Sequence, residues 1–112
     1  MSPRDWKLRI RDIIEAIQVI LGYTRGYRFE DLAADMRTMD AVIWRFVIIG
    51  EAATHVPEEI CRKHPEIPWR KMRGMRNYII HVYHRTSSET IWETITDDLP
   101  PLIPRLEELL KE

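Results

Sequence analysis

Apolar residues recur every three or four positions along most of this 112-residue chain, which is the period of an amphipathic α-helix. The first series runs from Trp6 to Leu21 and predicts one helix. Ser2-Pro3 suits its start, because serine can cap a helix and proline fits the first turn, where its missing N–H costs nothing. We expect Gly22 and Gly26 to end it.

A second helical region is predicted to open at Phe29 and to continue past Gly50, with a break near residues 38–40. Residues 41–49 are apolar on nearly every side of the helix apart from Arg45, so we expect more than one neighbour to bury this stretch. Gly50 is expected to permit the close approach of another helix.

Prolines divide the remainder of the chain, because proline inside a helix removes a hydrogen bond. They predict a broken connection over 57–68 with one short helix at 58–63, then a helix over 74–84. The final helix is expected to start at the Thr-x-x-Glu capping box of residues 86–89 and to be interrupted at 100–104. The fold class is therefore all-α, most simply an up-and-down four-helix bundle with an additional short helix, in one domain over 1–112.

Composition narrows the setting of this fold. The single Cys61 excludes an internal disulfide and a cysteine metal cluster, and no apolar run is long enough to cross a bilayer. The start of the chain lacks the apolar core of a secretory signal. We expect a soluble cytoplasmic protein.

The net charge of -1 conceals a strong partition along the chain. Residues 62–85 carry seven lysines and arginines against the single acid Glu66, a net +6, while 1–61 carry -2 and 86–112 carry -5. Three of the four histidines also lie in the basic window. This window is where an anionic ligand is expected, unless its bases only pair with the acidic flanks of the bundle.

The basic window holds a helix with two different faces. At about 100° per residue, one arc is expected to be polar and to present Arg73, Arg76, Asn77, His81, Tyr83 and His84. The opposite arc is expected to face the core with Met75, Tyr78, Ile79 and Val82.

The residue types on the polar arc suit phosphodiester chemistry. His81 titrates near neutral pH and can move a proton, and Arg76 offers a planar fork of donors that matches phosphate oxygens. Asn77 can orient the imidazole of His81 or bind a ribose. His81 and His84 could instead share a metal ion, although the segment supplies no acid beside them. Because Arg76 and His81 do not converge on one atom, a neighbouring helix or a second subunit must complete the site.

The spacing Arg76-x4-His81-x-Tyr83 resembles the motif of the HEPN superfamily, and in particular its HepT-like toxin branch. Other segments resemble that branch in the same order along most of the chain: 49–53, 65–69, 74–77, 91–93 and 98–100. The short motif alone is weak, whereas the ordered set is specific.

The resemblance implies a helical bundle that dimerises with its motif helices facing each other, and a metal-independent ribonuclease that needs no cofactor. It implies that Arg76 and His81 are the catalytic pair and that Asn77 supports them. Around them we expect the basic side chains to contact RNA phosphates: Arg73, His84 and Arg85.

The resemblance also implies a type VII-like toxin–antitoxin pair. The partner would be a minimal nucleotidyltransferase of the MntA type, which neutralises the toxin by transferring AMP to Tyr83. The alternative is a non-catalytic helical module that binds a nucleotidyltransferase or presents a nucleotide to it. Glu51 is expected to form a buried or half-buried ion pair with Arg76 or Arg45 rather than to act as a catalytic acid.

Overall fold

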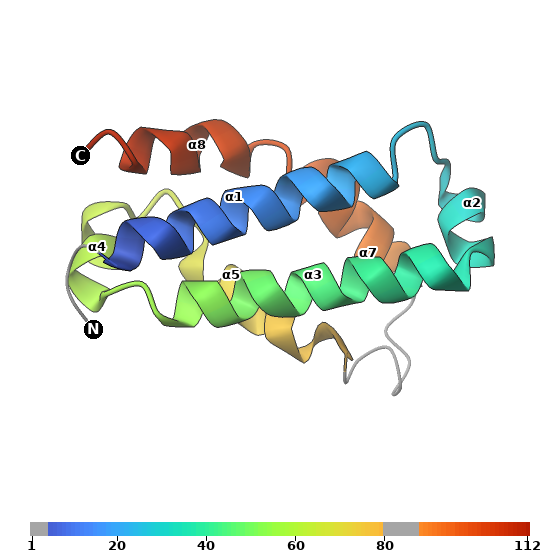
Figure 1. Ribbon diagram of the computed structural model, residues 1–112, viewed down its shortest axis with the longest axis horizontal. Helices are drawn as coiled ribbons and strands as arrows, with labels where there is room; N and C mark the ends of the chain where they lie inside the picture. Colours follow the sequence, from blue (N-terminus) through green and yellow to red (C-terminus); the bar gives the residue numbers. More distant parts are fainter. Residues whose placement is uncertain (1–4, 80–87) are drawn as a thin grey trace.

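The computed structural model describes residues 5–79 and 88–112. Every regular element in these ranges is helical, so the predicted all-α class is confirmed. Two of the helices, α1 and α3, are long and the others are short (Figure 1). In chain order the elements are α1 (Asp5–Tyr23), α2 (Phe29–Ala34), α3 (Met36–Thr54), α4 (Glu58–Lys63), α5 (Trp69–Gly74), the 3₁₀ turn η1 (Met75–Asn77), α7 (Ser88–Glu93), the π-helical turn η2 (Thr94–Asp98) and α8 (Leu102–Leu109).

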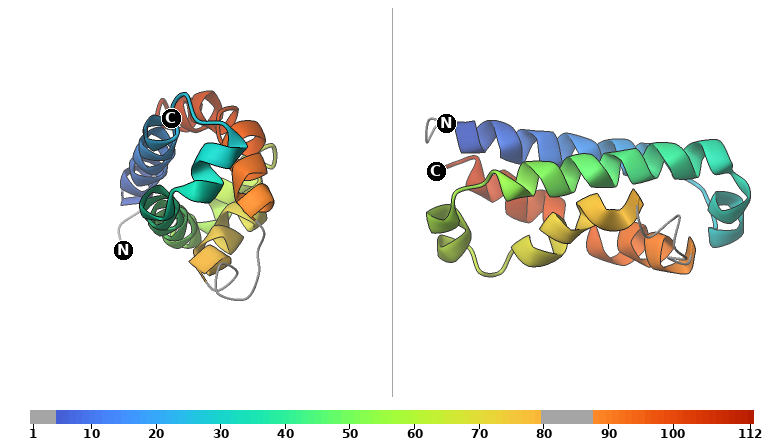
Figure 2. Two further views of the ribbon diagram at one scale, coloured as in Figure 1. Left: turned by 90° about the vertical axis from the view of Figure 1, so that its right-hand side faces the viewer. Right: turned by 90° about the horizontal axis from the view of Figure 1, so that it is seen from below.

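The long helices α1 and α3 lie antiparallel and form the spine of the molecule (Figure 1). Segment α5–η1 runs back along α3, and α8 lies beside α1, so the four sides of an up-and-down bundle enclose one core (Figure 2). The largest fully buried side chains come from α1, α2, α3, α5, η1, α7 and the connecting segments: Ile10, Ile13, Ile17, Ile20, Leu32, Phe46, Ile49, Ile67, Met72, Met75, Ile91 and Leu99. No helix in the described ranges is both long and apolar enough to span a membrane.

The second helical region breaks at Asp35, not at the predicted residues 38–40. Asp35 caps α3: its carboxylate accepts hydrogen bonds from the backbone N–H of Thr38 at 3.1 Å and from the Thr38 hydroxyl at 2.6 Å. The Tyr27 hydroxyl donates a third bond to it at 2.6 Å. Aspartate is a preferred N-cap residue. The cap separates α2 from α3 although the helical spacing of apolar residues continues across it, from Leu32 to Met36 and Met39.

Prolines delimit the short elements, with one shift from the predicted boundaries. Helix α4 follows Pro57 as expected, but the next helix begins at Trp69, directly after Pro68, and not at Gly74. Proline precedes a helix without cost because the first N–H groups of a helix have no partner in it. At the other end the helix is interrupted between Asp98, where η2 ends, and Leu102, where α8 begins, which confirms the prediction for Pro100 and Pro101. Pro104 lies inside the first turn of α8 and does not interrupt it, because the first N–H groups of a helix have no partner in it. The expected cap at Thr86 lies outside the described residues.

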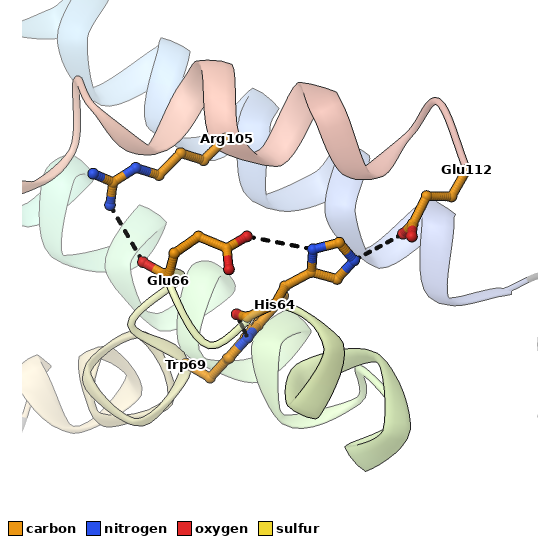
Figure 3. A network of polar contacts seen from close by, with 5 residues as sticks. All are labelled: His64, Glu66, Trp69, Arg105 and Glu112. Carbon is orange, nitrogen blue, oxygen red and sulfur yellow. Dashed lines mark hydrogen bonds and ion pairs between the residues drawn. The ribbon is translucent and has the colours of Figure 1, made fainter.

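The loop between α4 and α5 is fastened to the C-terminal segment, and this holds the start of α5 in place. His64 bridges two carboxylates, with Nδ1 3.3 Å from Glu66 and Nε2 2.9 Å from Glu112 (Figure 3). Arg105 donates a hydrogen bond to the Glu66 carbonyl, and the Trp69 indole donates one to the His64 carbonyl at 3.0 Å. No sequence pattern indicates these roles, because Arg105 is 39 positions from Glu66 and His64 is 48 positions from Glu112.

The cap at Asp35 makes the stability of the fold depend on pH. The hydroxyls of Thr38 and Tyr27 lower the pKa of Asp35 from 3.8 to about 2. A carboxylate whose pKa is lower in the folded state stabilises the fold above its unfolded pKa, and loses this effect as the pH falls through the folded value. For Asp35→Asn we therefore expect a urea midpoint below that of the wild type at pH 6, and a difference that shrinks as the pH falls from about 4 towards 2. Asp40→Asn removes the same charge from α3 without touching the cap, and serves as the control.

Candidate active site

Arg76 lies in η1, on the side of the bundle where α5–η1 packs along α3 (Figure 2). Its side chain is 48% exposed, and its Nη1 is 3.5 Å from the Glu51 Oε2 atom of α3. The guanidinium is therefore accessible and is held by one carboxylate. Asn77, the next residue along the turn, is exposed as well.

Gly50 brings the backbone of Arg76 into direct contact with α3. A Cβ atom on Gly50 would lie 2.7 Å from the Cβ of Arg76 and closer still to its backbone nitrogen. Real Cβ atoms do not make such contacts, so only glycine permits this spacing. The predicted close approach at Gly50 is confirmed, and it positions Arg76.

The other side of η1 is anchored in the core. Met75 is buried, and the ring of Tyr78 packs against Phe46 with centroids 4.9 Å apart. The Tyr78 hydroxyl also lies 3.3 Å from the hydroxyl of Thr94. These contacts prevent the turn that carries Arg76 from rotating about its axis.

Ile79 does not belong to the core stripe that the sequence predicted, because its side chain is 42% exposed. The prediction assumed a regular α-helix, with 3.6 residues per turn. Residues 75–77 form a 3₁₀ turn instead, with about three residues per turn, and this rotates the following side chains relative to the α-helical pattern.

Glu51 pairs with Arg76, as one of the two predicted partners, but the pair is not buried. The Glu51 side chain is 55% exposed, and the expectation of a buried or half-buried pair is wrong. Its carboxylate also lies 3.0 Å from Nε2 of His55, the residue that directly follows α3. The hydrogen bond to His55, supported by the positive charges of His55 and Arg76, lowers the pKa of Glu51 against a smaller effect of desolvation.

Arg73 faces a different neighbour from Arg76. Its Nη2 donates to the Cys61 sulfur at 3.1 Å and lies 4.0 Å from the Glu58 carboxylate, so it is directed to α4. Burial raises the pKa of the Cys61 thiol, which makes it a poor nucleophile. The other residues of the predicted site lie outside the described residues: His81, Tyr83, His84 and Arg85, together with Val82 of the predicted core stripe.

Two surface hollows adjoin this segment, and the sequence pattern singled out neither. One has a volume of about 470 Å³ and lies between α4, the following loop and α5, with Arg73 in its wall. The other, of about 190 Å³, lies between α1 and α3; it is lined by Trp44 and Glu51 among others, and Trp44 is 58% exposed. Within the described ranges, no group of three histidine, cysteine or acidic side chains is arranged to hold a metal ion.

Comparison with known proteins identifies the family. The family described as "Ribonuclease HepT-like" matches residues 13–109. The chain is 43% identical over 108 residues to "Probable ribonuclease HepT" of Thermococcus cleftensis, covering 96% of this chain and 98% of that protein. It is 32% identical over 112 residues to "Putative RNase MJ0127" of Methanocaldococcus jannaschii, covering 100% of this chain and 93% of that protein. No solved structure matches significantly. The chain belongs to the HepT-like ribonuclease family, as its motif predicted.

The contact at Gly50 can be tested with two glycines of the same chain. In Gly50→Ala the new methyl group clashes with the backbone of Arg76, so we expect a loss of about 1–3 kcal/mol in the free energy of unfolding, as for overpacked cores. In the control Gly74→Ala the new methyl group meets nothing within 4 Å, so we expect no loss and a gain of up to about 1 kcal/mol from helix propensity. Urea unfolding followed by circular dichroism measures both, and equal midpoints for the two variants would contradict the assignment.

Proposed function

We propose that this protein is a metal-independent endoribonuclease that cleaves RNA through attack of the 2′-hydroxyl group. The observation that carries the proposal is the accessible guanidinium of Arg76, which the backbone contact at Gly50 holds on the +6 segment of a HepT-like chain. The names of the relatives from Thermococcus cleftensis and Methanocaldococcus jannaschii describe ribonucleases, which supports the same reaction class.

In the proposed reaction, Arg76 and His81 have separate tasks. Arg76 binds the scissile phosphate and stabilises the charge that develops on its oxygens in the transition state. A histidine takes the proton of the 2′-hydroxyl as the O2′–P bond forms, and the imidazolium then gives this proton to the 5′ oxygen as the P–O5′ bond breaks. We assign the proton transfer to His81 and a supporting role to Asn77. Every atom of this step comes from RNA and these side chains.

We further propose that two copies of the chain face each other to complete the site. The sequence spacing of Arg76 and His81 does not by itself direct both side chains to one phosphate, and a second copy of the chain can contribute the missing group. The exposed Trp44 and the hollow beside it adjoin Glu51, the partner of Arg76, and Ile79 is exposed just beyond η1. Exposed apolar side chains beside a polar site are typical of a surface that another protein covers, here a second copy of the chain.

The proposed partner is a minimal nucleotidyltransferase antitoxin of the MntA type, which transfers AMP to Tyr83. In this step the Tyr83 phenol oxygen attacks the α-phosphate of ATP, a P–O bond forms, and pyrophosphate leaves with the displaced bond electrons. The phenol proton passes to solvent. An anionic adduct near Arg76 would occupy the position of the RNA phosphate and would thereby neutralise a toxin.

The ribonuclease proposal is tested with purified protein and single-stranded RNA in the presence of EDTA. We expect cleavage by the wild type, and at least a 100-fold lower rate for His81→Ala and for Arg76→Ala, the usual effect of removing a proton-transfer group or an electrostatic donor. Arg37→Ala removes an exposed arginine at the start of α3 and is the control that keeps full activity. Equal cleavage by all four proteins would indicate a contaminating nuclease, and RNA binding without any cleavage would favour the non-catalytic module.

The proposed modification is tested by co-expression with a minimal nucleotidyltransferase of the MntA type. Intact-protein mass spectrometry should show the mass of one or more AMP units on the wild type, and none on Tyr83→Phe, which lacks the acceptor oxygen. Tyr78→Phe is the matched control, because Tyr78 lies on the same segment and its ring is packed against Phe46. An adduct that maps to another residue would refute the assignment.

A further inference from the structure

The hollow between α4 and α5, called here the α4–α5 pocket, is lined by more basic than acidic side chains. Its volume of about 470 Å³ lies in the usual range for ligand sites, which is about 300–1,000 Å³. Three arginines line it, Arg62 from α4 and Arg70 and Arg73 from α5, against the single acid Glu58. The lining therefore carries an excess of two positive charges.

Two of these arginines are available to a ligand. Arg62 and Arg70 are both exposed, and neither has an ion pair within the described part of the chain. Arg73 is held by Cys61 and lies 4.0 Å from Glu58, so its charge is only partly neutralised. Guanidinium groups without a carboxylate partner are suited to bind phosphate oxygens through two parallel hydrogen bonds.

Most of the remaining wall is apolar. Pro65, Pro68 and Trp69 contribute to it, and Trp69 is buried and fixed by its hydrogen bond to the His64 carbonyl. Because the loop that carries these residues is tied to the C-terminal segment, the wall is formed before any ligand arrives (Figure 3). A rigid apolar wall beside arginines matches a nucleotide, which has a flat base and an anionic phosphate.

The pocket and the proposed catalytic arginine are formed by one continuous segment, α5–η1. Arg70, Arg73 and Arg76 follow one another at intervals of three residues along α5 and η1, with Arg73 directed to α4 and Arg76 to Glu51 of α3. Six residues of helix span about 9 Å, which is the length of two to three nucleotides stacked at about 3.4 Å each. A single strand whose phosphate is bound at Arg76 would thus reach the pocket within a few nucleotides.

From these observations we infer that the α4–α5 pocket is a binding subsite for a nucleotide of the RNA substrate, a few positions away from the bond that is cut. This inference rests on the proposed ribonuclease function and adds where the flanking RNA is held. An acidic protein segment would satisfy the arginines as well, but it would not use the apolar part of the wall or the short distance along the chain to Arg76.

Binding is measured on the full chain with a probe that cannot be cut. A fluorescein-labelled single-stranded 12-mer with 2′-O-methyl groups is titrated by anisotropy at several NaCl concentrations. We expect Arg62→Gln and Arg70→Gln each to weaken binding roughly tenfold, the effect of one lost charge-assisted hydrogen bond. Each should also lower the slope of log K against log salt by about 0.7, the value for one phosphate contact of a single strand. Arg70→Lys keeps the charge and should retain the slope.

Neighbouring residues on α4 supply matched controls. Lys63→Gln removes the same charge as Arg62→Gln from a residue outside the pocket lining, and we expect a change of less than about twofold. Glu58→Gln removes the acid of the pocket and should strengthen binding, whereas Glu59→Gln should not. Thermal melting by circular dichroism shows that each variant is folded; the substituted side chains are all exposed.

The outcomes separate this inference from the ribonuclease proposal. Equal effects of pocket and control variants would mean unspecific attraction and would overturn the subsite, as would an unchanged affinity in the pocket variants or no binding by the wild type. If only binding of a poly-glutamate peptide depends on Arg62 and Arg70, the surface recognises an acidic protein and the inference is wrong. If the wild type binds RNA with the expected pattern but never cleaves it, the ribonuclease proposal fails and the pocket remains as an RNA-binding site without a substrate role.

Discussion

The contact between Gly50 and the backbone of Arg76 is the constraint on which the rest of the site depends. It brings η1 against the middle of the bundle at a distance that no side chain at position 50 allows. Met75 and Tyr78 enter the core on one side of the turn, and Arg76 reaches solvent on the other. Close packing at a single glycine thus converts a stretch of basic sequence into an accessible guanidinium with a defined orientation.

The arginines near this contact are each paired with a nearby carboxylate. Glu51 and Glu58, from α3 and α4, each face one arginine of the basic segment, and they hold Arg76 and Arg73 in different directions. These pairs are exposed and contribute little to stability, so their effect is mainly on the orientation of the arginines. The net charge of -1 is therefore uninformative about the ligand, whereas the +6 carried by residues 62–85 describes the surface that a polyanion would meet.

Helical periodicity predicted the long elements because their packing follows from the apolar stripes of α1 and α3. The boundaries that differ were decided by local hydrogen bonds that periodicity does not register. Asp35 caps α3 and divides the second helical region at a place where the helical spacing of apolar residues continues without a break. The 3₁₀ turn at residues 75–77 changes the angle per residue, so Ile79 faces solvent although its spacing on an α-helix pointed to the core.

The sequence by itself determined the all-α class, the basic segment and the family, because spacing and charge are properties of the chain order. Only the tertiary structure decided which side chains meet. It joined Arg76 to Glu51 across 25 positions of sequence, exposed that pair to solvent, and formed a pocket from arginines of two separate helices. The physical reason is that burial and contact depend on how α3, α4 and α5 cross, and these crossings are set by the whole core and not by any one segment.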